Sequence, residues 1–216
     1  MTSAPSTSRT LPSWRFWLPL LCQAALILAI PSQALYTQVT GRTVILKTAP
    51  VDPYDLLRGY SVTLSYDISR VDTLRQLPGW SEFEKQGAAN SDRSATRFFY
   101  LVLEAPKVAD TNPPSPWRAV RISGDRPTNL ASNQVLLRGQ MRYGTVQYGL
   151  ETYYIPEDER DQINQNINAA NAAQANRGSQ PIVVEVKVDA QGHAVPRSFW
   201  VTLGKPPAKQ IYHYQF

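Results

Sequence analysis

The clearest sign of secondary structure in the chain is the segment Ile182-Val183-Val184-Glu185-Val186-Lys187-Val188-Asp189-Ala190-Gln191-Gly192. From Ile182 to Val188 every second residue is apolar, with Glu185 and Lys187 between them. A period of two places the apolar side chains on one face of a β-strand. The following Asp-Ala-Gln-Gly has the composition of a turn, and an apolar stretch returns over residues 197–203. This segment therefore predicts a β-hairpin.

Similar short apolar patterns recur along the chain. Residues 62–68 alternate apolar and polar side chains, which predicts a strand with one buried face. Residues 95–103 are apolar almost throughout, which predicts a central strand covered on both faces. The predicted strands cover residues 43–48, 62–68, 95–103, 117–123, 135–143, 145–155, 182–188 and 197–203. We therefore predict a mainly β domain, sandwich- or barrel-like, of about seven or eight strands.

One helix is predicted inside this domain. Pro156 precedes three acidic residues, which suit the partial positive charge at the start of a helix. Ile163, Ile167 and Ala170 follow at helical spacing, and Gly178 is a suitable stop. Residues 69–93 are ambiguous, since 77–80 resemble a turn and 81–86 could form one helical turn.

The N-terminus has the pattern of an export signal. Residues 1–13 are rich in Ser, Thr and Pro, and residues 14–35 are almost wholly apolar, with Arg15 near their start. The uncharged run from Phe16 to Leu35 contains 20 residues, about the length that crosses a bilayer. We expect a retained single-span anchor with its N-terminal tail in the cytoplasm. The alternative is cleavage after Ala34, because Ser32 and Ala34 are small residues at the spacing that signal peptidase requires.

This pattern sets the expected organisation of the chain. It predicts a cytoplasmic tail over 1–13, an anchor over 14–35, an extracytoplasmic β-rich domain over 36–205 and a C-terminal tail over 206–216. The expected location is the inner or plasma membrane, with a single span and the C-terminal domain on the periplasmic or extracytoplasmic side.

Composition excludes several classes of function. A single cysteine excludes a disulfide framework or a Cys-rich zinc site, and two histidines give little material for a metal centre. The formal charge is +5, but basic and acidic residues are interspersed without long runs, which argues against nucleic-acid binding. No phosphate-binding glycine motif occurs, so nucleotide binding is not expected. We therefore expect no metal and no cofactor.

The segment from Gly59 to Tyr66, Gly-Tyr-Ser-Val-Thr-Leu-Ser-Tyr, resembles the G-D-Y-x-x-L-x-Y motif of the GDYXXLXY family of bacterial membrane-anchored proteins. Tyr60 and Ser61 stand where the family has Asp and Tyr. Further blocks at 46–59, 148–157 and 188–192 extend the resemblance over about 35–203. The positions that it covers include Asp52, Pro53, Arg58, Gly59, Leu64, Tyr66, Glu151, Tyr154, Pro156 and Glu157. The resemblance implies an inner-membrane anchor and an extracytoplasmic β-rich domain, often encoded beside multi-pass membrane proteins, and no established reaction.

Carboxylates are the only candidates for catalysis. Asp52 and Asp55 flank a Pro-Tyr pair, and Glu151 lies in a strand rich in tyrosine. Two converging carboxylates could hydrolyse a glycosidic bond. We favour structural roles, in which the aspartates stabilise a turn and Glu151 pairs with Arg58 or Arg142.

The function most consistent with these patterns is a non-enzymatic binding or assembly subunit. Exposed strand edges and a tyrosine-rich face would suit a protein partner in the envelope or membrane, possibly a multi-pass membrane protein. Alternating tyrosines are also typical of core packing. Two alternatives remain. One is a carboxylate-dependent hydrolase or glycan-active enzyme that uses Glu151 with Asp52 or Asp55, and the other is a small-ligand sensor domain.

Overall fold

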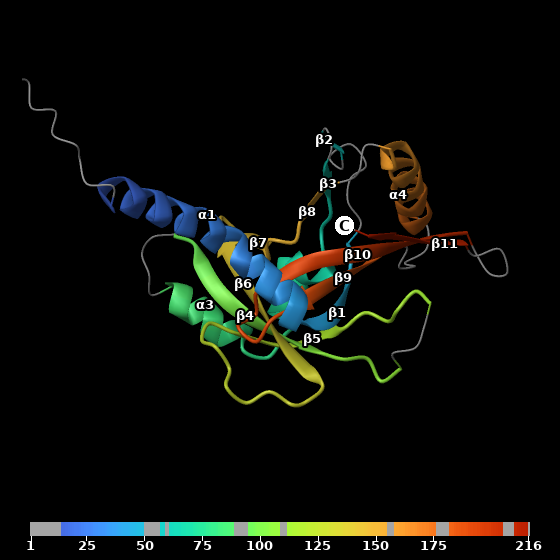
Figure 1. The fold of residues 1–216 in the computed structure, drawn as a ribbon. Helices are drawn as coiled ribbons and strands as arrows, with labels where there is room; N and C mark the ends of the chain where they lie inside the picture. Colours follow the sequence, from blue (N-terminus) through green and yellow to red (C-terminus); the bar gives the residue numbers. More distant parts are fainter. Residues whose placement is uncertain are drawn as a thin grey trace, which may run out of the picture.

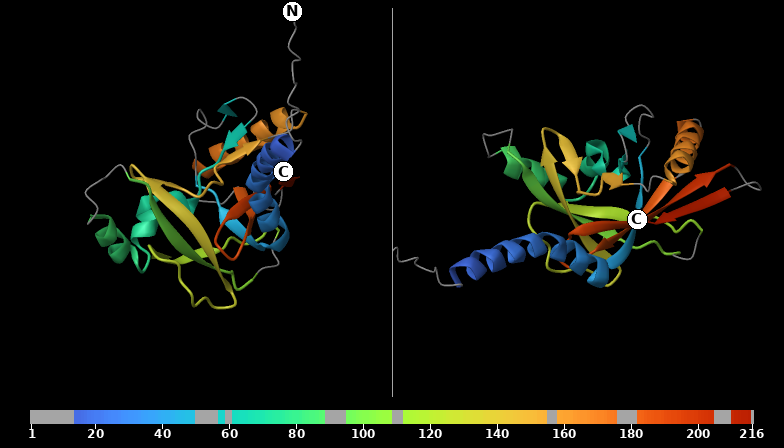
Figure 2. Two further views of the ribbon diagram at one scale, coloured as in Figure 1. Left: turned by 60° about the vertical axis from the view of Figure 1, so that its left-hand side comes forward. Right: turned by 45° about the horizontal axis from the view of Figure 1, so that its top comes forward.

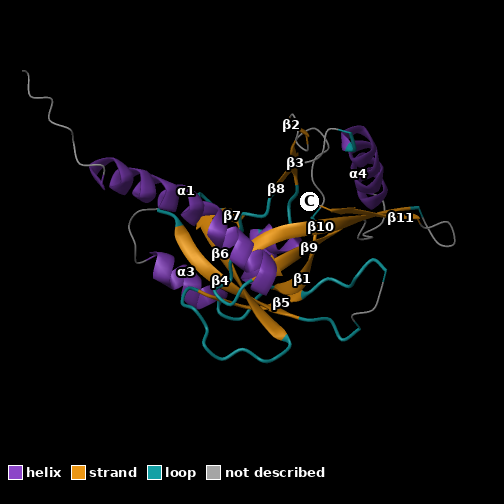
Figure 3. Cartoon of the chain, viewed as in Figure 1, coloured by secondary structure: helices purple, strands orange, loops and turns teal. Residues whose placement is uncertain are grey.

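The chain folds into three antiparallel sheets with several helices, so the prediction of a mainly β protein is confirmed (Figures 1 and 3). The structure is a computed structural model. It describes residues 14–49, 57–58, 61–88, 95–108, 112–154, 158–175, 182–204 and 210–215. Within these residues there are eleven strands rather than seven or eight, because one predicted strand is divided and the short strands β2 (Leu57–Arg58) and β11 (Gln210–Gln215) are added.

The first sheet contains the predicted hairpin and has the order β1-β9-β10-β11. Its strands are β1 (Arg42–Lys47), β9 (Ile182–Val188), β10 (Ala194–Leu203) and β11 (Gln210–Gln215). The register of the hairpin places Val184 opposite Phe199, with a bulge between Pro196 and Ser198. The segment expected to be a C-terminal tail thus contains an edge strand, β11, paired with β10.

The second sheet has the order β5-β4-β6-β7. Its strands are β4 (Arg97–Glu104), β5 (Arg118–Ser123), β6 (Gln134–Arg142) and β7 (Thr145–Gln147). Strand β4 lies between β5 and β6, as its apolar run predicted, and Leu101, Val102 and Leu103 are all buried. Gly139 of β6 lies against aromatic rings, since a Cβ there would come within 2.8 Å of the Tyr148 ring.

A small third sheet joins β2 (Leu57–Arg58), β3 (Ser61–Thr63) and β8 (Thr152–Tyr154). Two predictions are wrong here. The strand expected over 62–68 ends at Thr63 and is followed by the 3-10 helix η1 (Asp67–Ser69). The strand expected over 145–155 is divided into β7 and β8, because Gly149 has a φ of +76° that an extended strand does not adopt.

Helices cover the sheets at several places. The predicted helix is present as α4 (Arg160–Ala175), with Ile163, Ile167 and Ala170 buried. Two shorter helices, α2 (Val71–Arg75) and α3 (Trp80–Ala88), occupy the ambiguous region, so the expectation of one helix in the domain is wrong. The turn before α3 requires Gly79, which has a φ of +90° and lies against the Ile122 carbonyl group. One continuous apolar core receives side chains from both large sheets, α3 and α4.

The N-terminal helix α1 (Trp14–Thr40) has an extended course beside the β-rich body. Its final residues lie near β9 and β10, whereas its first turns extend past the sheets (Figure 2). The helix contains Pro19 and Pro31 and bends by 42° between Trp14–Ala29 and Pro31–Thr40. Among the described residues no single helix has the length and apolar character of a membrane span, and these two segments reach that standard only together.

Candidate functional site

A buried carboxylate organises the turn between β9 and β10. Asp189 is the first residue of this turn, and its side chain faces inward, so that the residue is only 4% exposed. Its Oδ1 atom accepts hydrogen bonds from the backbone N–H groups of Gln191 and His193, both at 2.9 Å. Aspartate is favoured at this position of a turn because its short side chain can accept from the backbone two residues further on.

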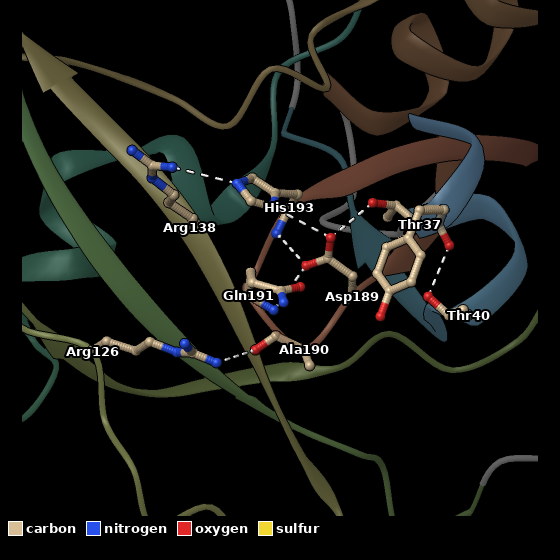
Figure 4. A network of polar contacts seen from close by, with 9 residues as sticks. Thr37, Thr40, Arg126, Arg138, Asp189, Ala190, Gln191 and His193 are labelled. Atoms are coloured by element: carbon tan, nitrogen blue, oxygen red, sulfur yellow. Dashed lines mark hydrogen bonds and ion pairs between the residues drawn. The ribbon is translucent and has the colours of Figure 1, made fainter. Parts of the chain in front are cut away.

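The second oxygen of Asp189 joins the turn to α1 and to a histidine (Figure 4). The Thr37 hydroxyl of α1 donates to Oδ2 at 2.8 Å, and Nδ1 of His193 lies 3.2 Å from the same atom. Burial alone would raise the pKa of Asp189, but the hydrogen bonds from Thr37, His193 and Gln191 outweigh it and hold that pKa below its ordinary value. The carboxylate is therefore ionised at neutral pH and orients the imidazole.

The other ring nitrogen of His193 faces Arg138 of β6. The Arg138 Nη1 atom lies 3.4 Å from His193 Nε2, and the guanidinium group lies over the Phe98 ring at 4.6 Å. With the carboxylate on one side and an arginine donor on the other, the neutral histidine carries its proton on Nδ1. The backbone fixes this pair, because Arg138 N–H donates to the Gly192 carbonyl at 2.8 Å.

Arg138 and His193 line a cavity of about 350 Å³. Its wall also includes Phe98, Gln140, Gln147 and Tyr148. The Gln140 and Gln147 side chains bond to each other at 3.2 Å across β6 and β7. Gly192 packs closely against β6, since a Cβ there would come within 2.9 Å of the backbone nitrogen of Arg138. The cavity therefore combines a cation, an imidazole, amides and aromatic surface.

This set of groups is suited to binding. No Ser, Thr or Cys and no carboxylate occurs among the described residues that line the cavity, and the Tyr148 hydroxyl donates to the Ile68 carbonyl. No group of three potential metal ligands occurs in the described part of the chain. What the wall offers to a ligand is positive charge, hydrogen-bond donors and flat apolar surface.

The residues of the motif form a second cluster, inside the core. Strand β3 pairs with β8, with Ser61 opposite Tyr154, and the Leu64 N–H donates to the Glu151 carbonyl at 2.8 Å. The two motif blocks therefore lie side by side although about 90 residues separate them in the sequence. Leu64 and Tyr66 are both buried.

Hydroxyl groups hold the parts of this core cluster together. The Tyr66 hydroxyl donates to the Leu150 carbonyl at 2.7 Å and also lies against the Tyr153 hydroxyl. The Tyr148 hydroxyl donates to the Ile68 carbonyl at 2.7 Å. Burial raises the pKa of Tyr66 well above the usual value, and the neighbouring Tyr153 and then Glu151 raise it further. Burial and then Glu151 likewise raise the pKa of Tyr148 well above the usual value. These tyrosines remain neutral and have a structural role.

Glu151 is the only predicted catalytic carboxylate within the described residues. Its Oε1 atom accepts the Tyr148 backbone N–H at 2.6 Å, which closes a local turn. It forms no ion pair with Arg142, which lies instead over the Tyr143 ring at 5.2 Å. The motif positions Asp52, Pro53, Asp55, Gly59, Pro156 and Glu157 and the side chains of Arg58 and Tyr154 lie outside the described residues, so pairing of Glu151 with Asp52 or Asp55 stays a prediction.

Sequence reasoning did not single out the Arg138–His193 site. Arg138 lies 55 positions from His193, and only the contact between β6 and the β9–β10 turn brings them together. A local signal was present, since Asp189 begins a turn and a histidine follows four residues later. An aspartate that accepts from the backbone of such a turn is well placed to orient this histidine.

Comparisons with known proteins agree with the resemblance noted in the sequence. The chain matches no curated protein and no solved structure. The model of the family described as GDYXXLXY protein matches residues 23–199, which is more than half of the chain. This match contains both motif blocks, which β3 and β8 place side by side, and the turn that begins at Asp189. The chain therefore belongs to the GDYXXLXY family.

Proposed function

We propose that the protein is a membrane-anchored binding or assembly subunit, with its β-rich domain on the extracytoplasmic side. The observation that carries this proposal is the exposure of apolar side chains along α1. Phe16 is 77% exposed and Trp17 is 58% exposed, and Leu21, Leu26 and Ile27 are also exposed. Such apolar side chains need a cover, and the uncharged run of 20 residues from Phe16 to Leu35 corresponds to about 30 Å of helix, about the thickness of a bilayer core.

The polar residues of α1 support the proposed orientation. Arg15 lies at its first turn, and positive charge favours the cytoplasmic side. At the other end, the buried hydrogen bond from Thr37 to Asp189 fixes the helix to the β-rich domain. The membrane segment would therefore pass directly into the folded domain, without a free linker between them.

A protein partner is the second part of the proposal. Strand β11 is an edge strand that pairs only with β10 among the described strands. Its exposed residues His213 and Gln215 lie on one face, where His213 stacks on Trp200 at 4.3 Å. An unpaired strand edge beside aromatic surface suits the addition of a strand from another envelope or membrane protein.

Labelling of single cysteines tests the anchor and its orientation. Cys22 is the only cysteine, so Cys22→Ser gives a background without thiols, to which Ser8→Cys or Lys107→Cys is added. In intact spheroplasts we expect a membrane-impermeant maleimide to label Lys107→Cys but not Ser8→Cys, and to label both after detergent treatment. Alkaline extraction should leave the chain in the membrane, and intact mass should show no loss of residues 1–34. Recovery in the soluble fraction, or the reverse labelling, would contradict the proposal.

Recovery from detergent-solubilised membranes tests the partner. We expect one membrane or envelope protein to copurify with the full chain at constant ratio. His213→Lys/Gln215→Lys adds charge to the β11 edge and should reduce this recovery several-fold, because charged edges resist strand addition. Thr128→Lys/Asn129→Lys adds the same charge to an exposed loop and should leave recovery unchanged. Repeated isolation of the protein alone would count against a partner.

A further inference from the structure

We propose that the cavity between β6, β7 and the β9–β10 turn binds a small ligand through an oxyanion group, with Arg138 and His193 as its direct contacts. The ligand class is a monosaccharide-sized acid that carries a carboxylate or a phosphate. This inference goes beyond the proposed function and does not depend on the membrane anchor or on a protein partner.

The charge of the cavity favours an anion. Arg138 is half-buried, and no described carboxylate lies within ion-pair distance of its guanidinium group. Among the described residues, none that lines the wall is acidic. A cation held in a concave surface without a counter-charge attracts an oxyanion more strongly than the same cation in open solvent. The Asp189 carboxylate, which lies behind His193, is already occupied by four hydrogen bonds.

The guanidinium group is also held in position before a ligand arrives. Its carbon lies 4.6 Å from the centre of the Phe98 ring, and Nη1 lies 3.4 Å from His193 Nε2. The backbone of Arg138 is tied to Gly192 at 2.8 Å. An arginine has five N–H donors in a planar fork, so those not used by His193 can contact two oxygens of one carboxylate or phosphate.

His193 supplies the second contact. Asp189 holds its Nδ1, which directs Nε2 toward Arg138 and the cavity. With its proton on Nδ1, the imidazole keeps Nε2 as an acceptor, which suits a hydroxyl group of the ligand while the remaining N–H groups of Arg138 hold the oxyanion.

The remaining wall indicates the size and the character of the ligand. A volume of about 350 Å³ is near the lower end of the range for small-molecule pockets. Gln140 and Gln147 offer amide groups that suit hydroxyls, and Phe98, which is 51% exposed, offers a flat face. A hydroxylated ring with one acidic group uses every part of this surface.

Calorimetric titration of the full chain in detergent tests the inference with three probes. Glucuronate presents a carboxylate, glucose 6-phosphate presents a phosphate, and glucose presents neither. We expect at least one of the two acids to bind with a Kd of about 1 mM or tighter, at least about tenfold tighter than glucose. The acid that binds identifies the anion, and added salt should weaken its binding.

Two matched variants show whether the cavity is responsible. Arg138→Met keeps apolar contact with Phe98 but removes the charge, and it should weaken acid binding at least about tenfold. Arg142→Met makes the same change on the same strand outside the cavity, and it should bind like the wild type. Thermal unfolding verifies that both are folded. Failure of both acids to bind, or equal binding by folded Arg138→Met and wild type, would overturn the inference, whatever the result of the anchor experiment.

Discussion

Replacing Tyr66 with alanine is expected to lower the free energy of unfolding by about 3–5 kcal/mol, enough to unfold much of a marginally stable domain. Tyr66 is 0% exposed, so the substitution leaves a large cavity at the junction of β3, η1 and the turn before β8. It also removes the hydroxyl that donates to the Leu150 carbonyl at 2.7 Å. Denaturant unfolding of the full chain in detergent, followed by tryptophan fluorescence, measures the change.

Two further tyrosine variants separate the parts of this effect. Tyr66→Phe keeps the ring and removes only the hydroxyl, so we expect a loss of about 1–3 kcal/mol. Tyr143→Ala alters a tyrosine that is 70% exposed and should change stability by less than about 0.5 kcal/mol. If Tyr66→Ala were as stable as Tyr143→Ala, the motif cluster would not be part of the core.

Replacing Asp189 with alanine is expected to cost about 3 kcal/mol of unfolding free energy. The carboxylate accepts from Thr37, Gln191 and twice from His193, so its loss leaves the buried Thr37 hydroxyl and the part-buried donors of the turn without this acceptor. Thr37→Val removes one of these hydrogen bonds and should cost about 1 kcal/mol. The difference between the two variants measures how much the turn itself depends on the carboxylate.

The pH dependence of stability is an independent test of whether the ionised Asp189 side chain stabilises the fold. Its pKa in the folded protein lies below the ordinary value of 3.8. The unfolded chain therefore takes up the proton first, so this stabilisation is complete above about pH 4 and is lost as pH falls through the folded pKa. Asp189→Asn should unfold with a shallower dependence in this acidic range. Identical pH profiles for Asp189→Asn and the wild type would exclude an ionised, stabilising Asp189.

The parts of the fold that sequence predicted are those fixed by local pattern. Strand β9 alternates apolar and polar residues, and β4 is continuously apolar, so both were found at nearly the right positions. Helix α4 was found because Ile163, Ile167 and Ala170 share one face. In each case the buried side chains lie within one element, and the period of the pattern is enough to identify it.

The parts that were missed depend on distant contacts. Strand β11 exists because β10 provides a partner, and its own six residues have only a weak alternation. The break at Gly149 requires a backbone conformation that no apolar pattern reveals. The site was missed for the same reason, since Arg138 and His193 meet only after β6 and the β9–β10 turn have packed together. The match of the motif blocks was visible in sequence, but their pairing through β3 and β8 was not.

The hydrogen bond between Thr37 and Asp189 gives α1 a mechanical connection to the rest of the molecule. The same carboxylate oxygen contacts His193 Nδ1, so one atom serves both the helix and the imidazole. The seating of α1 and the orientation of the imidazole therefore depend on one shared acceptor, so loss of the Thr37 hydroxyl is expected to alter the cavity wall as well as the contact of the helix.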